Sequence, residues 1–171
     1  RVLLLDVGTD GKALHSHADH PRQGWLNYCP AMTPPRASFT FDLVAPGDPA
    51  VVWERLWDLD KHTSTIPLTT VRGGPLSLAS TFVGRTALGP VGFDDVMVVR
   101  EWDPPRRVVI DKVGRVLRGS IEVTLEPCDQ GTLVRWSQSY GASGVPDALT
   151  SLTRPAVRAA YRHVVRRLTR A

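Results

Sequence analysis

A periodic pattern of apolar and polar residues begins at residue 38. Residues 38–44 alternate and are rich in aromatic and β-branched side chains, which predicts a strand. Residues 48–60 open on Asp48-Pro49, a helix start signal, and continue with apolar residues at helical spacing. A second short helical or turn segment follows at 61–66. From residue 68 the alternation returns, interrupted by turns containing Gly and Pro, and predicts six more strands: 69–72, 78–88, 93–102, 107–113, 115–126 and 132–140.

Residues 147–169 predict one long amphipathic helix. Val157, Tyr161 and Val164 fall on its apolar face at helical spacing. Pro155 lies inside this segment and is expected to kink the helix or to start its second half. The opposite side predicts an exposed basic row of arginines at i, i+4 spacing: Arg154, Arg158, Arg162, Arg166 and Arg170.

The order of these elements is β-α-α-β6-α. Because short turns join the strands, consecutive strands can pair as antiparallel hairpins. A sheet of seven strands buries one face against a single helix only if it curls around that helix. We therefore predict an α+β fold, a curved seven-stranded antiparallel sheet wrapped around a long C-terminal helix, with a groove between the two.

Composition narrows the class of protein. The 171 residues suit one domain, and no apolar run approaches the roughly 20 residues of a membrane-spanning helix. Cys29 and Cys128 stand far apart, which argues against a disulfide scaffold and a paired-cysteine zinc site and favours a reducing, cytoplasmic location. The net charge is +4, and the last 25 residues, with six arginines and one aspartate, account for all of it.

Residues 1–37 show no sustained period, so we expect an irregular N-terminal extension before a domain at 38–171. Met32 stands just before the regular pattern, and our hypothesis is that it is the native start of the chain. His15, His17 and His20 lie close together with Asp19, but without a scaffold to fix the rings we predict no metal site. Nucleotide-binding glycine motifs and hydrolase signatures are absent from the sequence, and we expect no cofactor.

Three segments carry a resemblance to a known family: APGDPAVVWERLWDLDKHTSTIPLT at 45–69, FVGRTALGPVGFDDVMVVREWDPPRRVV at 82–109, and VLRGSIEVTLEPCDQGTLVRW at 116–136. They resemble the START-like or SRPBCC superfamily, of the polyketide cyclase/dehydrase and lipid-transport type. The resemblance implies the helix-grip fold and a groove for a small hydrophobic molecule. It does not select one activity, because this fold serves carriers, cyclases, oxygenase domains and chaperone partners.

The hairpin of 78–88 and 93–102 holds the most informative polar residues. Pairing across its turn sets Arg85 opposite Asp94 on one face, while Asp95 belongs to the other. Which face lines the groove stays open at this stage. A buried carboxylate there can serve as an acid or base, whereas an exposed Arg85–Asp94 pair is an ordinary ion pair. The groove-lining candidates are His62, Phe82, Arg85, Phe93, Asp95, Met97, Glu122, Val157, Tyr161 and Val164.

Three functions are compatible with the predicted fold and groove. The first is intracellular binding of a small hydrophobic ligand, lipid or polyketide-like, in the groove. The second is a polyketide cyclase/dehydrase-type enzyme that uses the same groove. The third is docking through the basic row to an anionic membrane or an acidic protein, the alternative being a solvated helix face. Nucleic acid is disfavoured as a partner because no groove-reading motif accompanies the arginines.

Overall fold

The structure is a computed structural model, and it describes residues 37–170. The predictions made for residues 1–36, including Met32, Cys29 and the histidine cluster, lie outside the described residues. The elements are β1 (Ala37–Ala45), α1 (Pro49–Leu56), α2 (Leu59–Thr65), β2 (Thr69–Arg72), β3 (Thr81–Leu88), β4 (Val91–Asp103), β5 (Arg107–Val113), β6 (Leu117–Cys128), β7 (Gly131–Ala142), α3 (Asp147–Leu152) and α4 (Arg154–Arg170).

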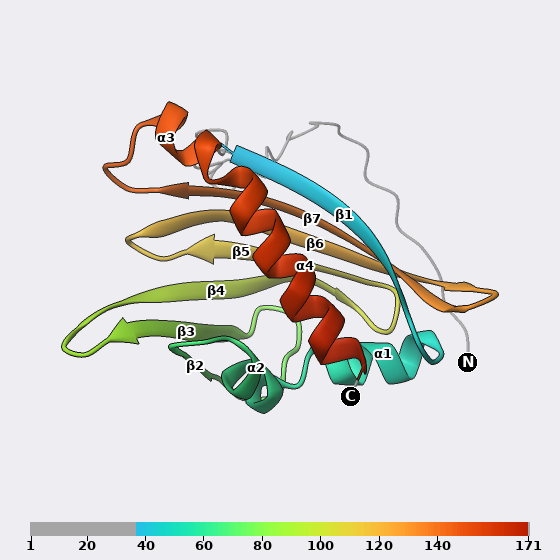
Figure 1. The fold of residues 1–171 in the computed structure, drawn as a ribbon. Coiled ribbons are helices and arrows are strands. Elements are labelled where there is room, and N and C mark those ends of the chain that lie inside the picture. The colour runs from blue at the N-terminus through green and yellow to red at the C-terminus, as the bar shows by residue number, and fades with distance from the viewer. Residues whose placement is uncertain (1–36, 171) are drawn as a thin grey trace, which may run out of the picture. The chain divides into compact units, whose positions relative to one another are not determined.

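All seven strands form one antiparallel sheet in the order β1-β7-β6-β5-β4-β3-β2. The sheet curls around α4, which crosses its concave face (Figure 1). This arrangement confirms the predicted α+β helix-grip fold. The hairpin register is also confirmed, because Arg85 pairs with Asp94 across β3 and β4.

The predicted helix 48–60 is in fact divided. Asp48 caps α1 by accepting a hydrogen bond from the Val51 N–H at 3.0 Å. Asp58 then caps α2 by accepting from the Asp60 and Lys61 N–H groups at 3.1 and 3.2 Å. A second capping aspartate inside the apolar pattern ends the first helix and begins another.

The C-terminal helical segment is divided as well. It breaks at Thr153, and Pro155 follows as the second residue of α4, as its position in the sequence predicted. The buried face of α4 comes from its C-terminal half, namely Val165, Leu168 and Thr169. None of the helices within residues 37–170 is long and apolar enough to cross a membrane.

Alternate residues of the strands point to the concave face, and in β1 every second residue is buried there. At one end of this face the rings of four tryptophans pack together, with Trp53 and Trp102 only 4.8 Å apart between centroids. We call this the closed end. Its rings are those of Trp53 and Trp136, which are buried in the core, and of Trp57 and Trp102, which are partly buried against it.

Candidate ligand-binding groove

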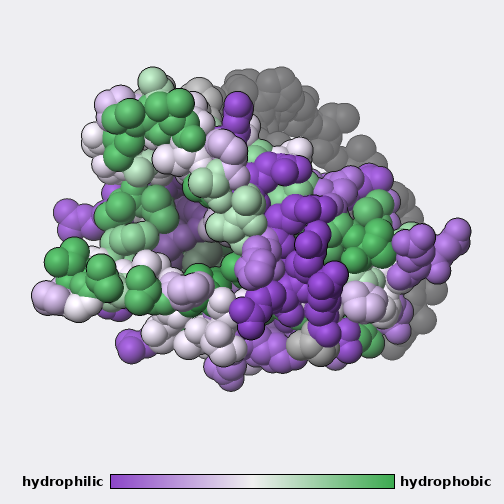
Figure 2. Space-filling model, viewed as in Figure 1, coloured by the Kyte–Doolittle hydropathy of each residue, from purple (hydrophilic) through white to green (hydrophobic). Residues whose placement is uncertain are grey.

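The other end of the concave face is covered less completely. Val157, Tyr161 and Val164, from the first and middle turns of α4, are only half-buried, whereas the later turns are sealed against the core. Figure 2 shows the same face hollowed between α3 and the β3–β4 hairpin. We call this the open end, and it is where the groove reaches solvent.

Apolar side chains surround the hollow. Leu88 and Val91 in the β3–β4 hairpin are 73% and 76% exposed, and Leu152 on α3 is 74% exposed. Together with Leu149, also exposed on α3, they form what we call the apolar rim, visible as hydrophobic surface on both sides of the hollow (Figure 2). Clustered exposed apolar side chains next to a concavity are typical of ligand-binding grooves.

A buried ion pair lies on the concave face between β4 and β5. Asp95 alternates with the buried Met97 and Val99, and Lys112 with the buried Val108 and Ile110, so both charged side chains point inward. The Lys112 ammonium donates to Asp95 Oδ2, and its Nζ lies 3.7 Å from Met97 Sδ. The sheet register places Lys112 directly opposite Met97, which brings the three side chains together.

Burial works to lower the pKa of Lys112, but Tyr161 and the Asp95 carboxylate outweigh it and hold the pKa above its ordinary value. Lys112 is therefore an ammonium ion at neutral pH and does not serve as an amine nucleophile. Asp95 Oδ1, by contrast, is buried and has no hydrogen-bond partner among the described residues. The Lys112 ammonium group thus has hydrogen-bond partners, whereas one oxygen of the Asp95 carboxylate has none.

The structure places several of the predicted groove residues on the concave face of the sheet or on the side of α4 that faces it. Phe82, Asp95 and Met97 are buried on the concave face, and Phe93 shares that face. This answers the question that the sequence left open, because the Asp95 side of the hairpin points inward. Tyr161, with Val157 and Val164, projects from α4 toward the sheet and contacts Phe39 and Trp136 at 5.8 Å between ring centroids.

Arg85 and Glu122 do not line the groove, which corrects two of the predicted positions. Arg85 lies on the convex face and pairs with Asp94 at 2.9 Å, with about half of each side chain exposed. Glu122 is on the same face and pairs with Arg107 at 3.2 Å. The reason is strand alternation, because the buried neighbours of these two residues, Gly84 in β3 and Ile121 and Val123 in β6, point to the opposite face.

His62 serves the fold rather than the groove. Its Nε2 lies 2.7 Å from the Leu56 carbonyl oxygen and donates a hydrogen bond to it at the end of α1. Burial lowers the pKa of His62 below 6.5, opposed by that hydrogen bond and by Asp58. The neutral ring thus satisfies a helix-end carbonyl that α1 itself cannot.

The sequence reading missed Lys112. The signal was present in RVVIDKV, where the lysine falls in phase with two buried apolar residues rather than with the polar positions. A charged residue at an apolar position of a strand indicates either an exposed end or a buried partner. Here the partner, Asp95, lies on the neighbouring strand.

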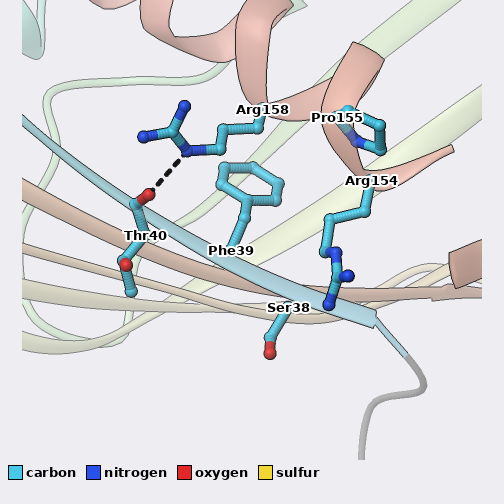
Figure 3. Close-up of a pocket in the computed structure, with 6 residues that line it drawn as sticks. All are labelled: Ser38, Phe39, Thr40, Arg154, Pro155 and Arg158. Atoms are coloured by element: carbon cyan, nitrogen blue, oxygen red, sulfur yellow. Dashed lines mark hydrogen bonds between the residues drawn. The ribbon is translucent and has the colours of Figure 1, made fainter.

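A separate pocket of about 360 Å³ lies where α4 begins, at the free edge of β1 (Figure 3). Arg158 Nε donates to the Thr40 carbonyl oxygen at 2.8 Å, so this arginine covers an unpaired strand edge. The predicted basic row is therefore not a purely solvated face. Arg154, Arg158 and Arg170 are exposed, while Arg162 and Arg166 are partly buried.

Metal-binding clusters of three or more ligating side chains do not occur within residues 37–170. Cys128 is a free and exposed thiol at the end of β6, beside the β6–β7 turn. Asp95, Lys112 and Tyr161 are polar side chains that come together between β4, β5 and α4.

The family model for polyketide cyclase/dehydrase and lipid transport proteins matches residues 36–171. Protein CV1439 from Chromobacterium violaceum is 11% identical, with a TM-score of 0.62 over 78% of this chain and 95% of that chain. TTHA0849 from Thermus thermophilus is 15% identical, with a TM-score of 0.59 over 77% and 96%. The di-domain ARO/CYC StfQ of the steffimycin biosynthetic pathway is 13% identical, with a TM-score of 0.60 over 78% and 50%.

At these identities the solved structures establish the fold alone, and no curated protein matches the chain. The family model, however, spans the whole of the described region. The chain therefore belongs to the polyketide cyclase/dehydrase and lipid transport family.

Proposed function

We propose that this protein binds a small hydrophobic molecule, lipid or polyketide-like, in the groove between the concave face of the sheet and α4. The observation that carries the proposal is the apolar rim around the hollow at the open end. When a ligand covers exposed leucine and valine side chains, burial of their apolar surface contributes roughly 25 cal/mol of binding free energy per Å². The family to which the chain belongs supports the same class of ligand.

Native mass spectrometry of the full chain, before and after extraction with organic solvent, tests the proposal. We expect a stoichiometric extra mass that extraction removes. The extracted protein should then bind naphthalene in a calorimetric titration, and Leu88→Ser/Leu152→Ser should weaken that binding. A matched control, Val44→Ser/Val51→Ser, alters two other exposed apolar residues outside the rim and should bind as the wild type does. An apo mass together with no naphthalene binding would refute the proposal.

A second candidate is a cyclase/dehydrase-type activity in the same groove. The observation that favours it is the buried Asp95–Lys112 pair beside Tyr161, since proton transfer needs polar groups held in an apolar site. Incubation with a linear poly-β-ketone would test it by mass spectrometry. Aldol cyclisation conserves the substrate mass and dehydration then removes one water, so a time-dependent loss of water that Asp95→Asn abolishes would support an enzyme.

Contact of the basic row with an anionic membrane or an acidic protein remains a separate proposal. Its support is the run of six arginines without an acidic residue along α4. Reversing Arg162, Arg166 and Arg170 to Glu should abolish sedimentation with vesicles rich in phosphatidylglycerol. Reversing three exposed arginines elsewhere, Arg72, Arg115 and Arg118, changes the net charge equally and should leave sedimentation intact.

A further inference from the structure

We infer that the open end of the groove selects a neutral ligand carrying a hydroxyl or phenol group, in preference to a hydrocarbon or a carboxylic acid, and that Asp95 is the residue that receives this group. The inference rests on the proposed function and names the chemical class of its ligand. It is drawn from the buried ion pair, which the fold does not require.

The pair is costly to bury. Asp95 and Lys112 are the two charged residues that the structure buries among the side chains it describes. Removing two charges from water costs several kcal/mol per ion, and well-packed apolar residues at such positions are often as stable or more so. Apolar side chains surround the pair on both strands, so an apolar pair would suit these positions.

Lys112 has no capacity left for a ligand. Its ammonium group donates to Asp95 Oδ2, interacts with the Tyr161 hydroxyl and lies against Met97 Sδ. An ammonium group has three donors, and these three neighbours account for them. A ligand carboxylate that sought a positive charge here would have to displace one of them.

Asp95 has capacity to spare. Its Oδ1 is buried without a hydrogen-bond partner among the described residues. An ionised carboxylate accepts hydrogen bonds but donates none. Asp95 is the more exposed partner, because 12% of its side chain is exposed against 2% of that of Lys112, although Oδ1 itself is buried. The group missing from the site is therefore a hydrogen-bond donor.

Glycines stand beside the pair on both neighbouring strands. Gly84 stands opposite Asp95 on β3, and Gly119 stands opposite Lys112 on β6. At Gly119 the backbone φ is +148°, and a Cβ atom would lie 2.1 Å from the Ser139 carbonyl oxygen, so only glycine fits. At Gly84 a Cβ atom would lie 3.5 Å from Met97 Cε, so the methionine side chain already fills the space beside this glycine.

These observations define the ligand end that fits. A hydroxyl or phenol donates one hydrogen bond to Asp95 and brings no charge. A hydrocarbon leaves Oδ1 unsatisfied, and a carboxylate places a second negative charge against it. A hydrogen bond to a charged acceptor corresponds to about a tenfold gain in affinity or more.

Calorimetric titration with 2-naphthol, naphthalene and 2-naphthoate at neutral pH tests the inference, because the three probes share one ring system. In the extracted full-length protein we expect 2-naphthol to bind about tenfold more tightly than naphthalene and 2-naphthoate to bind most weakly. Asp95→Leu/Lys112→Met removes both charges with side chains of similar size. In that variant the affinity for 2-naphthol should fall to the affinity for naphthalene. The affinity for naphthalene should be unchanged or higher than in the wild type.

The matched control is the other ion pair of the same hairpin. Arg85→Met/Asp94→Leu removes a cross-strand pair from the convex face and should leave the order of the three probes unchanged. Naphthalene binding without a preference for 2-naphthol, or a preference that survives in Asp95→Leu/Lys112→Met, would overturn this inference and leave the proposed function standing. Failure of all three probes to bind would overturn both.

Discussion

The two ends of the concave face share one sheet and one helix but differ in what fills them. At the closed end, α1 and the four tryptophans pack ring against ring, and the last turns of α4 are buried over the core. The open end instead contains a charged pair, two glycines and an exposed apolar rim. The comparison teaches that close packing is concentrated at one end of the fold, and we expect most of the stability to come from that end.

The largest effect is expected at the closed end. Trp53 is buried and contacts both Trp57 and Trp102, so Trp53→Ala should lower the free energy of unfolding by about 4 kcal/mol. Urea denaturation followed by circular dichroism measures it. Leu88→Ala, an apolar truncation at the open end, should cost less than about 0.5 kcal/mol. Equal losses in the two variants would contradict the division of the molecule into two ends.

The charged pair gives the next largest effect. Lys112→Met leaves Asp95 buried without its partner and should cost about 3 kcal/mol in the same measurement. Asp95→Leu/Lys112→Met should recover most of that loss, because no unpaired charge remains. A double variant as unstable as Lys112→Met would show that the pair itself holds the open end together.

A smaller, pH-dependent effect is expected at His62. Its pKa is lowered in the folded protein, so below pH 6.5 the unfolded chain takes up a proton that the folded protein does not. The free energy of unfolding should therefore fall as the pH drops from about 7.5 to about 5.5. His62→Gln, which keeps a donor for the Leu56 carbonyl, should show less of this loss than the wild type.

The exposed His163 on α4 supplies the control for that measurement. His163→Gln should retain the full wild-type loss between the two pH values. The same loss in His62→Gln and in the wild type would remove His62 as its source.

The smallest effect on stability belongs to the rim. Leu88→Ser/Leu152→Ser should change the free energy of unfolding by less than about 0.5 kcal/mol, because both side chains already face water. The same variant should weaken naphthalene binding, as proposed above. A stability loss comparable to that of Trp53→Ala would place these leucines in the core and contradict the groove.

The fold could be predicted from the sequence because the patterns that indicate it are local. Alternation, capping residues and turn chemistry fixed the order of elements, and the bounds of β2 and β5 agree residue for residue with the prediction. The division of both helical segments was less visible. Asp58 and Thr153 interrupt apolar patterns that continue across them, so the period alone does not reveal the break.

The candidate site could be predicted from the sequence only in part, because its central contact, Asp95 with Lys112, joins two strands. Asp95 was identified from its place in the hairpin, but its partner depended on the register between β4 and β5. That register contains a bulge between Val99 and Glu101, which sequence spacing does not encode. Arg85 and Glu122 were misplaced for a simpler reason, since alternation gives two faces without saying which one is buried.

The pairing of β1 with β7 has a consequence for how the chain reaches this structure. Short turns join strands β3 to β7, whereas the contact between Phe41 and Trp136 joins residues from opposite ends of the described chain. Contacts between residues so far apart in sequence close late and slow folding. We therefore expect the β3–β7 meander to form first and β1, carrying α1 with it, to add last. The closed end, the most stable part of the finished molecule, is thus assembled in the final step.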